Sequence, residues 1–168
     1  MDGICNDIER TVMVNTIIDE ILGRRKEISR MNLPYLWDSS RGLYLHKYHD
    51  HRRGTSGTRD LVESFGYDTK QVMHAIRIIK VIERFAENGF SDFGAAIWFE
   101  GKEREELLGI KAGSIRPEDV VQRLESEMEA LDRLKEEYRR QEPDTATKDW
   151  LDSKVMELVR TVAMEGCA

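Results

Sequence analysis

Three polar side chains have the types and the spacing to contact a phosphate group. Lys70, His74 and Arg77 are four and three residues apart, so in a helix they project from one side. The apolar residues around them predict a largely buried helix, which must either pair its charges or expose them. Lys70 and Arg77 would therefore face acidic side chains or a ligand. For His74 the alternative is a hydrogen bond within a crowded helical bundle.

A second basic group precedes this helix and accompanies a run of histidines. Lys47, Arg52 and Arg53, together with His49, could contact a phosphate or an RNA backbone. The histidines form an H-x-x-H-x-H run at positions 46, 49 and 51, and two of them could share a helical face as metal ligands. No clear fourth ligand accompanies them, and the adjacent arginines would repel a cation, so a metal site is not favoured. An ordinary solvated helix end is the simplest interpretation.

These side chains are positioned by a helix predicted from Asp68 to about Asn88. Asp68 is a good N-cap, and Gln71 can return the hydrogen bond in a capping box. Apolar residues then recur at three- and four-residue steps up to Phe85, and Gly89 supplies the stop. So many apolar positions leave only a narrow polar strip, which predicts a central helix with neighbours on most sides.

Hydrophobic periodicity along the rest of the chain predicts an all-α protein, a bundle of five to seven helices. Besides the central helix, helical regions are expected at about residues 7–30, 40–48, 59–65, 102–111, 117–140 and 144–162. Asn32–Ser40 is expected to be a connector, because the residue before Pro34 is disfavoured in a helix. At most a small extended element is expected near Ala95–Phe99. We expect a single domain over residues 1–168, with the N-terminal helix and connector in 1–39 and the other helices in 40–165.

Composition and charge favour a helix-rich soluble protein with a basic centre. A chain of 168 residues of which 40% are apolar can bury a sizeable core. The 35% of charged residues and the presence of only three prolines fit a helix-rich soluble protein. The formal net charge of −6 argues against a protein that coats nucleic acid non-specifically. Residues 41–84 nevertheless carry nine Lys/Arg against five Asp/Glu, a net +4, and leave the rest of the chain at −10. This centre could attract a phosphate-bearing ligand, or pair with the chain's own acidic helices.

The cysteines and the apolar runs favour a reduced, cytoplasmic setting. Cys5 and Cys167 lie near the two ends and have neither metal-ligand spacing nor the pattern of a disulfide framework. Acidic residues interrupt the first ten positions, so no secretory leader is expected. No apolar run is long enough to span a bilayer, and no membrane contact is expected.

The central run also carries a family resemblance. Residues 66–70 have the sequence GYDTK, followed by MH at 73–74 and IR at 76–77. This run resembles a signature in the C-terminal half of predicted nucleotidyltransferases of the DNA polymerase β superfamily, the group found beside RNA ligases in RNA repair. The similarity covers about residues 40–162. Its further parts are residues 106–113, the long acidic helix that follows, and residues 142–144.

The catalytic pattern of that superfamily is missing from this sequence. It consists of a Gly-Ser turn followed by paired metal-binding aspartates on a strand, whereas here Gly54–Gly57 is followed by Arg59 and Asp60 without such a pair. The resemblance therefore implies the helical half of such an enzyme without its catalytic half. No catalytic residue, metal site or cofactor is expected in this chain, and Mg²⁺ would enter only with a catalytic partner.

The leading hypothesis is an accessory helical module, related to the C-terminal part of a nucleotidyltransferase, that contacts nucleotide or RNA phosphates beside a catalytic partner. No nucleophile–base arrangement is visible, so we do not expect this chain alone to be an enzyme. The residues expected to contact the nucleotide or phosphate are Lys70, His74, Arg77, Asp68, Lys47, Arg52 and Arg53. The partners implied are a nucleotide or RNA, and a catalytic protein or a second copy of the chain.

Two other functions stay open. The chain could be a protein-interaction or regulatory module, similar to an inhibitor, whose acidic helix at Glu118–Arg140 binds another protein without binding nucleotide. It could also be a stand-alone nucleotide-processing enzyme in which the basic centre works with an unrecognised carboxylate. Loss of turnover in Lys70→Ala or His74→Ala would support the enzyme.

Overall fold

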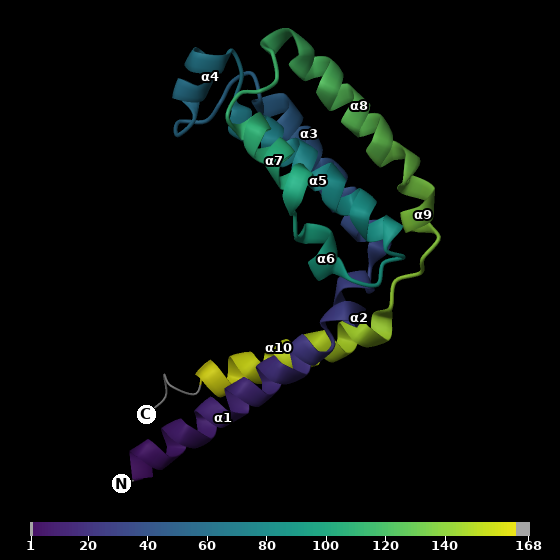
Figure 1. Ribbon diagram of the computed structural model, residues 1–168. Helices are drawn as coiled ribbons and strands as arrows, with labels where there is room; N and C mark the ends of the chain where they lie inside the picture. The colour runs from purple at the N-terminus through teal and green to yellow at the C-terminus, as the bar shows by residue number, and fades with distance from the viewer. Residues whose placement is uncertain (1, 164–168) are drawn as a thin grey trace. The chain divides into compact units, whose positions relative to one another are not determined.

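A computed structural model describes residues 2–163, and the side chains of residues 7–163. All regular structure in this range is helical (Figure 1), which confirms the all-α class. The described chain forms two compact units, one drawn from residues 2–32 and 143–163 and the other from residues 33–142. The last expected helix therefore belongs to the first unit. Within the described range, no helix is both long and apolar enough to cross a membrane.

The second unit is built around α5, Thr69–Glu87, which is the expected central helix. The helices α3 (Leu33–Asp50), α7 (Gly101–Lys111) and α8 (Val120–Arg133) all pack against it (Figure 1). The predicted apolar positions of α5 are buried: Val72, Ala75, Ile76, Ile79, Ile82 and Phe85. Burying one such isoleucine stabilises the fold by about 1.5–3 kcal/mol, so packing against three neighbours fixes the position of α5.

Asp68 caps the start of α5, as predicted, but the return hydrogen bond expected from the Gln71 side chain is not formed. The Asp68 carboxylate accepts a hydrogen bond from the Gln71 backbone N at 3.0 Å. The Asp68 backbone N instead donates to the His51 carbonyl oxygen at 2.7 Å, which ties the end of α3 to the start of α5. At the other end of α5, Asn88 is the C-cap and Gly89 has a φ of 66°, a left-handed conformation that glycine adopts readily.

The α3 helix begins at Leu33, earlier than predicted. Pro34 lies in its first turn, where a missing N–H removes no intrahelical hydrogen bond. Leu33 and Trp37 are buried, and the Trp37 indole N donates to the Leu131 carbonyl oxygen at 3.1 Å. Ser40, at the end of the expected connector, is buried inside the helix. The connector prediction was wrong because burial of these apolar side chains outweighs the local bias before proline.

The remaining elements of the second unit are short. Their bounds are Arg59–Phe65 for α4, Phe93–Ile97 for α6, Pro117–Asp119 for the 3₁₀-helix η1 and Lys135–Arg139 for α9. The element predicted near residues 95–99 is partly helical, because Asp92 caps α6 by accepting from the Ala95 backbone N at 3.0 Å; extended backbone begins at Trp98. Helical segments outnumber the predicted regions, because α6 is added and the regions at 7–30 and 117–140 are divided.

The first unit consists mainly of two long helices that lie side by side (Figure 1). Its helices are α1 (Asp2–Gly23), α2 (Arg25–Arg30) and α10 (Thr145–Ala163). Ile17 of α1 is buried, and the Arg24 guanidinium lies 4.1 Å from the ring centroid of Trp150 on α10. The side chains of Cys5 and Cys167 lie outside the part of the chain that the structure describes.

Candidate functional site

The structure gathers four cationic side chains around His74 on α5. Lys70 and Arg77 flank it on the same helix, while Lys47 comes from α3 and Lys111 from α7. The pKa of His74 lies below the usual histidine value. Burial is the largest cause, and the four positive charges lower the pKa further. His74 is therefore neutral at pH 7. We call these five residues the basic cluster.

The cations of the basic cluster have no acidic partner within the described residues. Lys47, Lys70 and Lys111 form no ion pair there, and Arg77 places its guanidinium 5.8 Å from the Phe99 ring centroid. Lys70, Arg77 and Lys111 are exposed, and Lys47 is half-buried. Because like charges repel one another, a bound anion would relieve the repulsion among them.

Part of the basic cluster lines a groove between α3 and α5. Lys47, His74 and Arg77 are the charged or titratable groups of this groove, which has a volume of about 380 Å³. Its other lining residues are mainly apolar: Leu36, Ser40, Leu43, Ile78, Val81, Ile82 and Phe93. Apolar walls lower the local dielectric constant, so the polar groups act more strongly on an anion here than in open water.

Asp68, also predicted as a site residue, lies inside the fold. Its side chain is fully buried, with one carboxylate oxygen accepting from the Gln71 backbone N and the other from the Thr58 hydroxyl. The Thr58 oxygen in turn accepts from the Thr55 backbone N at 2.8 Å. These bonds order the glycine-containing loop before α4 against the first turn of α5. Asp68 therefore positions the helix that carries Lys70 and does not face solvent.

The other predicted residues do not join the basic cluster. Arg52 and Arg53 are exposed in the turn after α3, and they are not among the charges that lower the histidine pKa of the cluster. The histidine run does not converge either, because His51 is buried whereas His46 and His49 are exposed. Among the side chains that the structure describes, no three His, Cys, Asp or Glu residues are placed to share a metal ion.

Sequence reasoning missed two features beside the basic cluster. Lys111 ends α7, and only the packing of α7 on α5 brings it to the cluster. Trp98 is 67% exposed and lies in a second groove, of about 620 Å³, which Arg77 and Lys111 also line. The available signal in the sequence was the bulky run at residues 95–99, between Gly94 and Gly101. This run predicts a small extended element but does not predict which residues lie next to it.

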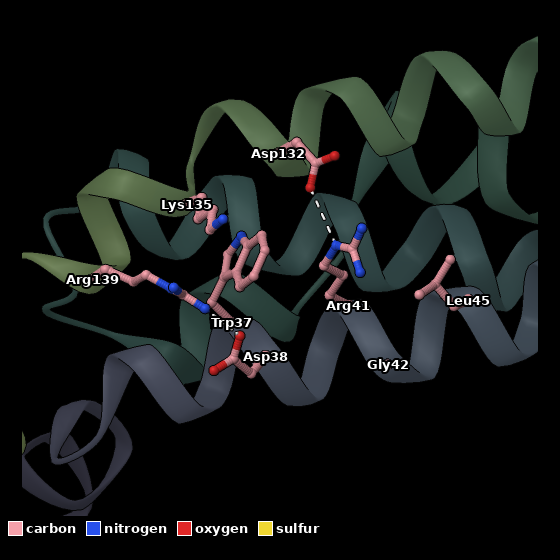
Figure 2. Close-up of a pocket in the computed structure, with 8 residues that line it drawn as sticks. All are labelled: Trp37, Asp38, Arg41, Gly42, Leu45, Asp132, Lys135 and Arg139. Atoms are coloured by element: carbon pink, nitrogen blue, oxygen red, sulfur yellow. Dashed lines mark hydrogen bonds and ion pairs between the residues drawn. The ribbon is translucent and has the colours of Figure 1, made fainter.

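The hollow around Trp37 contains two arginines that are already paired with carboxylates (Figure 2). It has a volume of about 650 Å³ and is lined by Trp37, Asp38, Arg41, Gly42, Leu45, Asp132, Lys135 and Arg139. Arg41 pairs with Asp132 at 3.3 Å, and Arg139 pairs with Asp38 at 3.0 Å. Both guanidinium groups and the Lys135 ammonium lie 5.5 to 5.9 Å from the Trp37 ring centroid. These contacts hold α3 against the α8–α9 segment, so we assign this hollow a packing role.

The basic cluster can bind an anion, but it shows no group arranged to carry out a reaction. All the charges that act on His74 are positive, so no carboxylate orients this histidine as a general base. Comparison of the chain with known protein families, curated proteins and solved structures finds no match. Function is therefore inferred from the chemistry of the site.

Proposed function

We propose that this chain is an accessory helical module that binds the phosphate groups of a nucleotide or an RNA beside a catalytic partner. One observation carries the proposal: four cationic side chains surround His74, and no carboxylate in the described part of the chain neutralises them. Several other cations of the same unit are paired, as Lys80 is with Glu106 at 3.1 Å. A phosphate would supply the negative charge that the basic cluster lacks.

The side chains of the basic cluster would contribute in different ways. Arg77 can offer two parallel N–H donors to one phosphate, whereas the three lysines act as point charges on the same or neighbouring phosphates. Neutral His74 can donate one hydrogen bond from the ring nitrogen that carries the proton. Arg52 and Arg53, exposed at the end of α3, would extend the basic surface along a longer RNA.

The resemblance to predicted nucleotidyltransferases of the DNA polymerase β superfamily supports the same proposal. Lys70, His74 and Arg77 lie in the run that carries it, and the other residues of that run have packing roles. For example, the Tyr67 hydroxyl donates to the Ile115 carbonyl oxygen at 2.8 Å. We propose that the chain corresponds to the helical half of such an enzyme. A partner would then supply catalysis and any Mg²⁺ that catalysis needs.

A binding titration tests this function. Tripolyphosphate, ATP and a short RNA are titrated into the full chain and into a Lys70→Ala/Arg77→Ala variant at low and moderate salt. We expect binding that weakens with salt, and an affinity at least tenfold lower in the variant. Thermal unfolding of the variant should match the wild type, because both side chains are exposed.

A matched control removes two cations from the first unit, in a Lys148→Ala/Arg160→Ala variant. Both of these residues are exposed on α10, so the control changes the net charge equally without touching the basic cluster. It should bind like the wild type. Absence of binding by the wild type, or an equal loss in both variants, would contradict a phosphate site on α5.

Protein interaction is the second candidate function, and exposed apolar side chains of the first unit favour it. These residues are Ile8, Val12, Met13, Ile18 and Leu22 on α1, and Val155, Met156, Val159 and Val162 on α10. Contiguous exposed apolar surface often marks a protein contact. Sedimentation analysis of the wild type and a Val12→Glu/Val159→Glu variant should reveal self-association that the variant loses. A wild-type monomer at all concentrations would exclude a second copy of the chain as the partner.

A further inference from the structure

A second groove lies beside the basic cluster and presents an exposed tryptophan. It has a volume of about 620 Å³ and is formed by α5, α7 and the segment 97–101. Trp98 is 67% exposed, and its neighbours Ile97 and Leu108 are 42% and 46% exposed. Phe99 lines the same groove and is less exposed. We call this the Trp98 groove.

The Trp98 side chain is exposed, yet it is held in place. Its indole N donates to Glu100 Oε1 at 2.6 Å. Arg84 donates to the carbonyl oxygens of Trp98 and Ala95 at 2.8 and 3.0 Å, and its guanidinium lies 4.9 Å from the Phe99 ring centroid. An aromatic side chain fixed in this way loses little conformational entropy when a ligand stacks on it. The exposed ring is therefore a prepared contact surface.

The charges around the Trp98 groove suit an anionic ligand. Arg77, Arg104 and Lys111 line it, and none of them forms an ion pair within the described residues. Glu100 is the carboxylate among the lining residues, and it already accepts the indole hydrogen bond. Arg77 and Lys111 also belong to the basic cluster. The groove and the cluster therefore meet along these two side chains.

From this arrangement we propose that the ligand is a single-stranded nucleic acid, with an unpaired base stacked on Trp98 and the adjoining phosphates on the basic cluster. The inference rests on the proposed function and adds the class of ligand to it. A base inside a duplex is covered on both faces, whereas an unpaired base can offer a face to an aromatic side chain. Such stacking tolerates all four bases, so the groove selects single strands without reading a sequence.

Three probes and two variants test the inference on the full chain. The probes are a single-stranded RNA of about eight nucleotides, the same sequence as a duplex, and tripolyphosphate. Trp98→Ala should weaken single-stranded RNA binding about tenfold and leave tripolyphosphate binding unchanged. The matched control is Tyr35→Ala, which removes an equally exposed aromatic side chain of α3 that lines neither groove and should change neither. The wild type should prefer the single strand to the duplex.

The outcomes separate this inference from the proposed function. If Trp98→Ala leaves RNA binding unchanged, or weakens RNA and tripolyphosphate equally, the inference fails while phosphate binding stands. An equal loss of RNA binding in Trp98→Ala and Tyr35→Ala would show a non-specific effect and also overturn it. If the wild type binds neither RNA nor tripolyphosphate, the proposed function itself fails. A Trp98-dependent complex with an acidic amphipathic peptide, and none with RNA, would assign the groove to a protein partner.

Discussion

The two halves of α5 each carry two cationic side chains, but these cations meet different surroundings. In the second half, Lys80 and Arg84 each pair with a glutamate of α7 at 3.1 Å. In the first half, Lys70 and Arg77 meet no carboxylate within the described residues. A cation with a built-in partner is already neutralised, whereas an unpaired cation leaves its field available to a ligand. This difference supports the proposal that the second half of the helix has a structural role and the first half binds the ligand.

The order of charges along α7 produces this difference. Glu103 and Glu106 lie in its first half and Lys111 in its last turn, a distribution that also suits the helix dipole. Packing on α5 places the acidic half against Lys80 and Arg84, while Lys111 adds its charge to those around His74. One helix therefore neutralises one half of α5 and makes the other half more positive.

The largest expected effect is on stability, and it follows from removing the N-cap that holds the first half of α5 in place. Asp68→Ala removes the N-cap and leaves the buried Thr58 hydroxyl without its carboxylate, so we expect the free energy of unfolding to fall by about 2 kcal/mol. Urea unfolding measures it. The control is Asp60→Ala, an exposed acid in α4, which should change stability by less than about 0.5 kcal/mol. Equal losses in the two variants would show that the Asp68 hydrogen bonds contribute little.

A matched pair of lysine variants tests the comparison directly. Lys70→Ala should lower RNA affinity about fivefold and reduce the salt dependence of binding by the share of about one phosphate contact. Lys80→Ala should leave affinity unchanged and cost only up to about 1 kcal/mol of stability, because its ion pair is partly exposed. Titrations at several salt concentrations and urea unfolding give both quantities. The assignment of binding to the first half would be wrong if Lys80→Ala weakened RNA binding as much as Lys70→Ala.

The sequence predicted α5 almost to the residue, because its cap, periodicity and stop signal agree. The start of α3 was mispredicted because the bias before Pro34 is local, whereas burial of Leu33 and Trp37 depends on helices far along the chain. Helical spacing was enough to predict that Lys70, His74 and Arg77 lie close together on α5. It could not identify Lys111, which only tertiary packing brings near. Asp68 was expected both to cap the helix and to contact the ligand. Because its side chain is fully buried, only the capping role agrees with the structure.

Removing one acid of α7 should make the second half of α5, whose cations are in ion pairs, resemble the first half, whose cations are not. Glu106 pairs with Lys80 at 3.1 Å and with Arg123 at 2.8 Å, so Glu106→Gln frees positive charge beside the basic cluster. Arg123 keeps its second partner, Glu127, at 2.7 Å, so Lys80 is the cation that loses its ion pair. We expect RNA affinity to rise two- to threefold at low salt, an increase that about 0.5 M salt removes by screening. Glu125→Gln, an exposed acid of α8 without an ion pair in the described residues, is the control for net charge. An equal rise in both variants would indicate a general charge effect.

The smallest expected effect concerns proton uptake by His74. Burial first, and then Lys47, Lys70, Arg77 and Lys111, lower its pKa in the folded chain below 6.5. The unfolded chain therefore takes up this proton more readily, so the contribution of His74 to stability is unfavourable below about pH 6.5 and vanishes above about pH 7.5. Bound phosphates would offset the four cations and raise the pKa of His74. RNA binding should then become slightly stronger as the pH falls from about 7.5 to 6.

Calorimetry in two buffers of different ionisation enthalpy measures this proton uptake. RNA phosphodiesters do not titrate between pH 6 and 7.5, so uptake belongs to the protein. We expect a fraction of one proton per bound RNA in the wild type and none in His74→Gln, which keeps a hydrogen-bonding side chain. Equal uptake in both proteins would place the titrating group elsewhere. Uptake that disappears with His74 would locate the ligand at the unpaired half of α5, because the Lys80–Arg84 half contributes no charge to the pKa shift of His74.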